Sequence, residues 1–465
     1  MASTQSQKPN VVVFFTDQQR WDTTGAHGNP ADLTPNFDLM ATQGTFAQNC
    51  FTCQPVCAPA RASFQTGMYA TQTGVFRNGL VLPGDMQTLA GEFRDAGYAT
   101  GYIGKWHLGS DNRVRESERG GYEYWLAANA LEYSSNVYNT IMYDRQNRPV
   151  FLPGYRVDAL TDAAIRYISD HRQEPFFLFL SYLEPHFQNH LDDYPPPVGY
   201  RERYRSGWIP PDLAALGGST HQHLAGYYGM VKRLDEALGR LRDALISLQL
   251  DQSTVVMYSS DHGCHFKTRN AEYKRSCHES SVAIPTAFCG PGFDSGGRIT
   301  KLVSLVDFAP TLLDCAGIPI PGQMQGRSIL PLVRQEPVDW PEEVFIQISE
   351  SQVGRAIRTN RWKYSVVAPD KSGRDDPTSE HYVEECLYDL LSDPYELCNL
   401  VDAETHLEVR AELKRRLIQQ MVRAGEDEPT VAAVPQRPSS QRHVTMKEAF
   451  SPNPYRGLTQ LPHDE

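Results

Sequence analysis

The chain has 465 residues, 40% of them hydrophobic, and a formal net charge of -12. This length exceeds a usual single core and favours one large domain with a smaller one. The net negative charge argues against nucleic acid as the main partner, because phosphate backbones need a basic surface. No apolar run is long enough to span a membrane, and the N-terminus lacks the apolar core of a signal peptide. We expect a cytoplasmic protein, or a periplasmic or secreted one whose signal peptide has been removed.

Short apolar runs rich in β-branched and aromatic residues alternate with helical patterns through most of the chain. This alternation predicts an α/β fold with a large, mostly parallel sheet sandwiched by helices. Polar or ionisable residues directly follow four of the predicted strands, at 11–16, 99–103, 176–182 and 254–260. Ligands of open α/β sheets bind beyond the carboxyl ends of strands, so these segments are expected to converge on one site.

The pattern changes after about residue 341. Before that point, apolar spacing predicts helices at 224–250 and 302–316. After it, we expect short antiparallel strands and then a helix, at 344–348, 354–359, 362–367, 387–390 and about 406–423. The predicted domains are an α/β catalytic domain over 1–343, a C-terminal α+β subdomain with a short antiparallel sheet over 344–425, and an extension over 426–465. Its composition predicts that this extension wraps the surface or lacks fixed structure.

The segment Cys57-Ala58-Pro59-Ala60-Arg61 carries the most information. Pro59 suits the first turn of a helix, which places Cys57 at the helix N-terminus. Free N–H groups and the helix dipole favour an anion at this position, such as a sulfate or phosphate ester. Arg61, one turn further on, is placed to pair with that anion. The alternative is a buried or low-pKa thiol at the start of a helix.

Two further pairs of residues are candidates for a metal site. Asp17 and Gln18 follow the first of the four strands, and Asp261 and His262 follow the last. Carboxylate and amide oxygens favour calcium or magnesium, and an imidazole admits manganese or zinc. The alternative is that Asp17 caps a helix and that the Asp-His-Gly turn simply ends a strand.

The nine cysteines do not form a paired framework. Cys50, Cys53 and Cys57 lack the distal pair that a zinc site would need, so mostly reduced thiols are expected. Cys386 and Cys398 flank a predicted turn and could pair in an oxidising compartment.

Together these motifs resemble the type I sulfatases of the alkaline-phosphatase superfamily, most of all bacterial members that degrade polysaccharides. The segments that carry the resemblance are 10–17, 57–67, 104–109, 260–263, 387–390, 393–396 and 399–400. The resemblance implies hydrolysis of a sulfate ester of a sulfated carbohydrate, with release of inorganic sulfate. It also implies that a formylglycine-generating enzyme, or an equivalent one, oxidises Cys57 to formylglycine.

The resemblance also implies a role for each matching residue. Arg61 would orient the hydrated aldehyde, Lys105 would contact the sulfate, and His107 would act as base when the sulfated hemiacetal collapses. His186 and Lys274 would bind the sulfate and assist the leaving oxygen, with Lys267 as the competitor for the place of Lys274.

Calcium would be held by Asp17, Gln18, modified Cys57, Asp261 and His262, with manganese or zinc as alternatives. Many family members carry a second aspartate in place of Gln18 and an asparagine in place of His262. The identity of the metal therefore stays open.

A basic, histidine-rich segment at 264–278 follows the fourth strand, and the candidates for contact with an anionic sugar are His190, His265, Lys267, Arg269, Arg275 and His278. The alternative for this segment is a solvated loop. Two other functions stay open at this point: a phosphonate or phosphate monoester hydrolase that uses the same aldehyde, and a non-catalytic binder of sulfated glycans.

Overall fold

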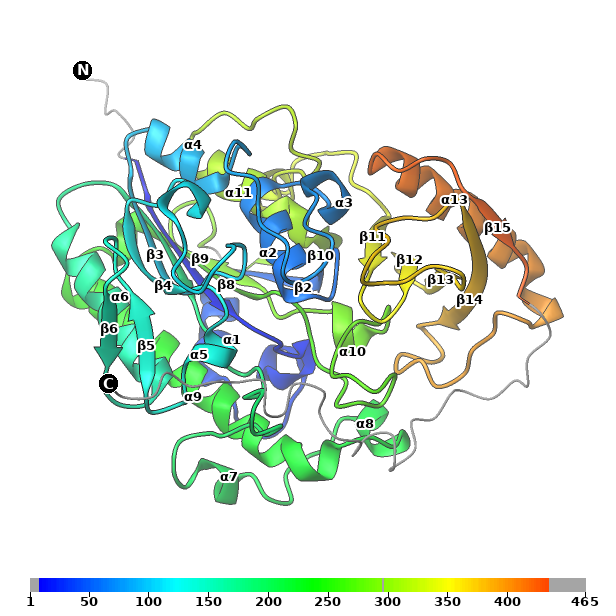
Figure 1. Cartoon of the computed structure of the whole chain (residues 1–465), viewed down its shortest axis with the longest axis horizontal. Helices are drawn as coiled ribbons and strands as arrows, with labels where there is room; N and C mark the ends of the chain where they lie inside the picture. Colours follow the sequence, from blue (N-terminus) through cyan, green and yellow to red (C-terminus); the bar gives the residue numbers. More distant parts are fainter. Residues whose placement is uncertain (1–7, 295–296, 435–465) are drawn as a thin grey trace.

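The computed structural model describes residues 8–294 and 297–434 and contains two separate sheets (Figure 1). The larger sheet has ten strands, and its four central neighbours, β8, β1, β7 and β3, are parallel. Antiparallel pairs occur at β9 and at the β4–β5–β6 edge. In spatial order the strands are β10 (Gly297–Ser304), β2 (Thr45–Phe51), β9 (Ala287–Cys289), β8 (Thr254–Ser260), β1 (Asn10–Thr16), β7 (Phe176–Ser181), β3 (Ala99–Lys105), β4 (Tyr124–Ala128), β5 (Thr140–Tyr143) and β6 (Pro149–Leu152).

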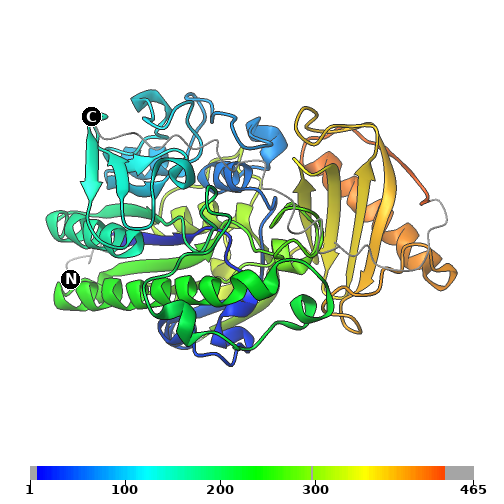
Figure 2. The same ribbon diagram turned by 60° about the horizontal axis from the view of Figure 1, so that its bottom comes forward.

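Helices cover both faces of this sheet (Figures 1 and 2). Alternate side chains of β1 enter different cores: Val11, Val13 and Phe15 belong to one, and Val12 and Phe14 to the other. Burial on both faces explains why the strand is a continuous apolar run. The first core contains α2 (Cys57–Thr66), α4 (Leu89–Asp95) and α11 (Phe308–Cys315), and the second contains α1 (Pro35–Gln43), α6 (Arg156–Asp170) and α9 (Thr220–Ser247).

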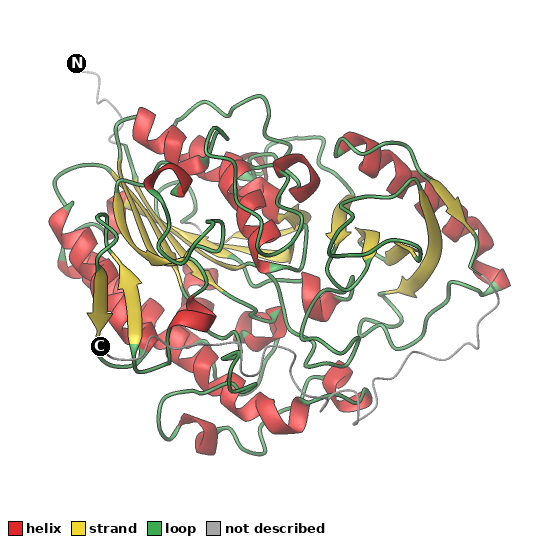
Figure 3. Cartoon of the chain, in the orientation of Figure 1, coloured by secondary structure: helices red, strands yellow, loops and turns green. Residues whose placement is uncertain are grey.

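The smaller sheet is mainly antiparallel and lies beside the larger one (Figure 3). One of its faces packs on α13 (Leu407–Arg423), and the other packs on residues of β2, β10 and α10 (Glu279–Val282). Its strands are β11 (Glu343–Ile348), β12 (Val353–Thr359), β13 (Trp362–Ala368), β14 (His381–Asp389) and β15 (Thr430–Ala432). The short helices are α3 (Ala70–Thr73), α5 (Leu131–Ser134), α7 (Tyr200–Arg203), α8 (Pro211–Ala215) and α12 (Leu330–Val333). Across the described residues, every helix is too short or too polar to cross a membrane.

The predicted fold class is confirmed, and three predicted elements need correction. The helix expected at 302–316 is wrong over its first residues, because β10 continues to Ser304 and a capping box between Ser304 and Asp307 begins the helical turn. The strand expected at 387–390 begins earlier, at His381. Within the predicted extension, β15 pairs with β14, and residues 435–465 lie outside the described part of the chain.

Candidate active site

Cys57 is the first residue of α2, with Val56 as its N-cap. Every residue of this helix is buried, the Ala58 N–H donates to Asn78 Oδ1 at 3.0 Å, and Pro59 has no N–H. The positive end of the helix dipole favours a negative charge at Cys57. The predicted position of Cys57 at a helix N-terminus is therefore confirmed.

Two lysines approach the Cys57 sulfur. Lys274 Nζ lies 2.7 Å from Cys57 Sγ, and Lys105 Nζ lies 3.8 Å from it. His262 Nε2 is 3.3 Å from the same sulfur. Burial would raise the pKa of the Cys57 thiol, but these three groups together lower it well below its usual range. The surroundings of Cys57 are therefore built to hold a negative charge.

Asp17, Cys57, Asp261 and His262 form a buried cluster whose ligand atoms all lie within 4.8 Å of one another. His262 Nδ1 is 2.9 Å from the Gly263 carbonyl, so a proton on Nδ1 leaves a lone pair on Nε2 facing the cluster. Gln18 Oε1 is buried without a hydrogen-bond partner among the described residues. The donors of this cluster therefore fit a divalent metal ion.

Arg61 and Lys105 neutralise the acidic side of the cluster. Arg61 Nη2 lies 3.0 Å from Asp17 Oδ2 and 3.3 Å from Asp261 Oδ2. Lys105 Nζ donates to Asp17 Oδ2 at 2.8 Å. Burial would raise the pKa of Asp17, but the positive charges nearby hold it well below its ordinary value. Burial and the neighbouring Asp17 raise the pKa of Asp261 to about 6.

His186 follows β7, and its Nε2 lies 3.3 Å from Lys274 Nζ. Its Nδ1 is 2.6 Å from the Phe187 carbonyl, which fixes the orientation of the ring. Burial and Lys274 lower the pKa of His186. An anion bound between these groups would offset that effect, since it favours the protonated ring.

A cavity of about 530 Å³ opens onto Cys57. The segments around the large sheet line it with His107, His186 and Lys274, and the segments around the small sheet contribute Glu350, Arg374 and Asp375. A volume of this size is typical of small-molecule sites. Of the residues predicted at the four strand ends, His107 and His186 therefore line this cavity, whereas Asp17, Asp261 and His262 lie beside Cys57 and are not part of the lining.

The six candidates for sugar contact are not gathered in this way. Within the described part of the chain, the cavity lining includes Arg275 but not His190, His265, Lys267, Arg269 or His278. Arg275 forms ion pairs with Glu272 and Glu350 at the cavity wall.

The other five side chains have contacts elsewhere. Four of them belong to the loop at 264–278, which folds into the protein instead of lying in solvent. His265 is fully buried and bonds the Lys274 carbonyl, and Lys267 pairs with Asp192. Arg269 donates to the carbonyls of Tyr395 and Glu396. The remaining two, His278 and His190, contact Tyr388 and Gln188.

Glu132, on α5, is the main site residue that the sequence did not suggest. Its Oε1 accepts from Lys105 Nζ at 3.0 Å and lies 3.8 Å from His107 Nε2. It is buried, yet it lines the cavity. Nothing in the local sequence marks it, because its role depends on where α5 lies relative to β3.

A cysteine at a helix N-terminus, two buried lysines and a metal-type cluster fit the hydrolysis of an anionic ester. The sulfatase family model matches residues 9–318, and the model of the N-sulphoglucosamine sulphohydrolase C-terminal region matches residues 271–423. The chain belongs to the sulfatase family and is a sulfuric ester hydrolase.

Known proteins match over nearly the whole chain. An ulvan-active sulfatase of Formosa agariphila is 29% identical over 90% of this chain and 82% of its own. An N-acetylglucosamine-6-O-sulfatase of Bacteroides thetaiotaomicron is 23% identical over 89% of this chain and 86% of its own. A solved structure in complex with its substrate D-glucosamine-2-N,6-O-disulfate shares the fold, with a TM-score of 0.75 and 22% identity over 91% of this chain and 99% of that one.

Proposed function

We propose that this sulfatase hydrolyses a sulfate ester of a sulfated oligo- or polysaccharide and that Cys57, converted to formylglycine, is its nucleophile. One observation carries the proposal: Cys57 Sγ lies at the N-terminus of α2, within 3.8 Å of both Lys105 Nζ and Lys274 Nζ. In the unmodified chain this sulfur marks the position of the formylglycine side chain. Once formed, the hydrated aldehyde would supply a hydroxyl that attacks the sulfur of the sulfate ester, and the bond from that sulfur to the saccharide oxygen would break.

The neighbouring residues then divide the work. Lys105 and Lys274 stabilise the negative charge on the sulfuryl oxygens, because both are buried and fixed before the reaction begins. His186 and Lys274 face the leaving oxygen, where a general acid contributes roughly 10² to 10⁴-fold. Arg61 holds Asp17 and Asp261 in place, and His107 takes up a proton during release of sulfate.

Calcium is the metal that we propose for Asp17, Gln18, Asp261, His262 and the modified residue. Oxygen ligands predominate once the Cys57 sulfur has been replaced, and this favours a hard cation. When bound, such an ion supplies Lewis-acid stabilisation of charge beside the nucleophile. Manganese and zinc remain alternatives because His262 contributes nitrogen.

A saccharide is proposed as the substrate for two reasons. The cavity is lined by polar and charged side chains from both domains, which suits a ligand with many hydroxyl groups. Relatives named for ulvan and for N-acetylglucosamine-6-O-sulfate cover most of the chain. Maturation requires a formylglycine-generating enzyme or an equivalent one as a partner.

The test combines mass spectrometry of the peptide that contains Cys57 with sulfate release from a panel of sulfated saccharides. We expect the mass of the thiol-to-aldehyde change at Cys57 and release of inorganic sulfate. Cys57→Ala should abolish that release, and Cys398→Ser, which alters an exposed thiol, should preserve it.

Two results would contradict the proposal. An aldehyde at Cys57 with turnover of phosphonate or phosphate esters alone would assign the other activity considered for this superfamily. An unmodified Cys57 and no turnover, in a host that matures such enzymes, would leave a binder of sulfated glycans.

A further inference from the structure

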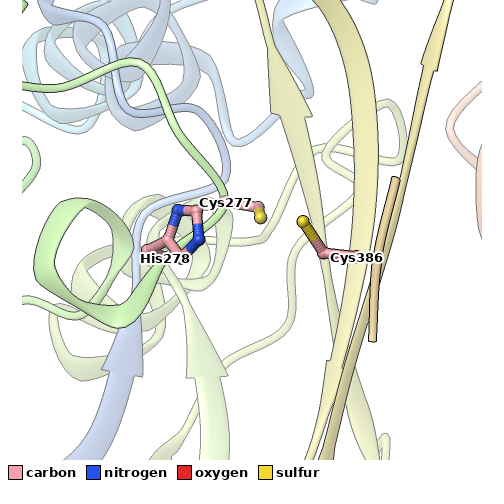
Figure 4. A group of neighbouring side chains, drawn as sticks. All are labelled: Cys277, His278 and Cys386. Atoms are coloured by element: carbon pink, nitrogen blue, oxygen red, sulfur yellow. The ribbon is translucent and has the colours of Figure 1, made fainter. Parts of the chain in front are cut away.

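A second group of metal-type ligands lies away from Cys57, where the loop at 264–278 meets the small sheet. Cys277, His278 and Cys386 each offer one ligand atom, and these three atoms lie within 4.8 Å of one another. Figure 4 shows the sulfur atoms of Cys277 and Cys386 facing each other, with the His278 ring beside Cys277. Cys277 and His278 directly precede α10, and Cys386 belongs to β14.

The chemistry of the three groups is that of a soft metal site. Cys277 and Cys386 are 3% and 8% exposed, so water has little access to their sulfurs. His278 Nε2 lies 3.1 Å from the Tyr388 hydroxyl, which orients the ring. His278 Nδ1 is buried and has no hydrogen-bond partner among the described residues. A buried nitrogen without a partner costs free energy, and coordination to a metal would remove that cost.

We propose that Cys277, His278 and Cys386 bind one zinc ion that joins the catalytic-domain loop to strand β14. Thiolate and imidazole ligands select zinc among the common divalent ions. Tetrahedral geometry with Zn–S bonds of about 2.3 Å places two sulfurs about 3.8 Å apart, so the two sulfurs need to approach each other by about 1 Å at most. On binding, each thiol releases one proton to solvent, and the fourth position is left for water.

This zinc site would affect the active site only by holding the loop that carries residues of both sites. Lys274 and Arg275, which line the cavity, lie in the same loop shortly before Cys277. A metal link between Cys277 and Cys386 would therefore fix this loop against the small domain. The proposal is independent of the substrate and of the nucleophile, since it involves none of the catalytic residues.

Cobalt(II) is the probe, because its bonds to thiolates give a charge-transfer absorption band in the near ultraviolet. The full chain is prepared with Cys57→Ser, so that the catalytic cluster holds no thiolate, and it is kept reduced and stripped of metal with a chelator. We expect the band to saturate within two equivalents of cobalt, because the catalytic cluster can bind a second ion without a thiolate band, and to disappear on addition of zinc. The same chain with Cys398→Ser, a change at an exposed cysteine, should keep the band.

Adding Cys386→Ser to this chain should abolish the charge-transfer band that the Cys57→Ser chain shows. Adding His278→Ala should weaken cobalt binding, and this variant serves if the Cys386→Ser variant does not fold. A Cys57→Ser chain that folds but shows no thiolate band would overturn the proposal. So would a band that survives in both ligand variants. A Cys277–Cys386 disulfide in protein isolated without reductant, together with no cobalt binding after reduction, would identify a redox pair instead.

Discussion

Glu132 gives the active site a negative charge that a sulfate-binding cavity would not be expected to contain. Burial would raise its pKa, but Lys105, His107 and His186 lower it, so the carboxylate is ionised. Its contacts fit a positioning role, because one oxygen contacts Lys105 and lies near His107. The negative charge of Glu132 weakens the attraction of the cavity for the substrate anion.

We therefore expect Glu132→Gln to lower kcat roughly ten-fold or more, part of the ~10² to 10⁴-fold that general acid–base catalysis contributes. KM for a sulfate ester should stay the same or fall, because a negative charge leaves the cavity. Steady-state kinetics of the two proteins checks this, with Glu123→Gln, at an exposed position, as the matched control. A raised KM with an unchanged kcat would show that Glu132 binds substrate instead.

His265 predicts how stability depends on pH. Its Nε2 bonds the Lys274 carbonyl at 3.0 Å and it is fully buried. Burial lowers its pKa to about 3, against about 6.5 in an unfolded chain. Its neutral form thus stabilises the fold fully above pH 6.5, and this contribution is lost as the pH falls towards 3.

Between pH 7.5 and pH 4 this loss amounts to about 3 kcal/mol, at about 1.4 kcal/mol per pKa unit. The free energy of unfolding, measured with urea at each pH, should therefore fall by about 3 kcal/mol less over this range in His265→Gln, where the side chain does not titrate. His221→Gln changes an exposed histidine and should leave the pH dependence of the free energy of unfolding unchanged. If the free energy of unfolding fell equally with pH in the unmodified protein and in both variants, His265 would not govern the acid sensitivity.

At the scale of elements, Lys363 of β13 links the small sheet to α10. Its Nζ lies 2.7 Å from Glu279 Oε1 and 2.6 Å from Glu396 Oε1, and its side chain is fully buried. Replacing Lys363 removes this ion pair from Glu396, whereas Glu279 keeps its pair with Arg358 at 3.2 Å.

Lys363→Met should lower the free energy of unfolding by about 3 to 5 kcal/mol. Chemical denaturation measures this, and Lys371→Met is the control, since it breaks a partly exposed pair worth at most about 1 kcal/mol. Equal stability of the two variants would show that the buried ion pairs do not hold the small sheet on α10.

The elements also show what could be predicted from the sequence. The strands β1, β7 and β8 were predictable because each is a buried apolar run that ends in polar residues. Their neighbouring parallel pairing explains why the residues that follow them meet.

Contacts between distant loops gave no such signal. Glu132 and Arg374 reach the cavity only because α5 and the segments around the small sheet pack where they do. The basic loop at 264–278 looked solvent-facing or substrate-facing by composition, yet His265 is part of the interior. Cys386 and Cys398, which could pair in an oxidising compartment, are both free in the structure, and Cys386 lies beside Cys277.

At the scale of the whole molecule, the charge of -12 opposes the approach of a polyanionic saccharide. The cavity does not reverse this effect, since cations and anions are balanced among its charged lining residues other than histidine: Arg77, Lys274, Arg275, Arg374, Glu132, Glu272, Glu350 and Asp375. Attraction is therefore confined to the buried groups around Cys57, which act only at short range.

This distribution predicts an unusual response to salt. For an oligosaccharide with several sulfates, kcat/KM should rise as ionic strength increases from about 0.01 M to about 0.15 M, because the Debye length falls from about 30 Å to about 8 Å and screens the repulsion. A monosulfated sugar, measured at the same calcium concentration, should respond less. If kcat/KM instead fell steeply for the oligosaccharide alone, long-range attraction by a basic surface would have to outweigh the net charge, and the enzyme would be steered towards polyanions.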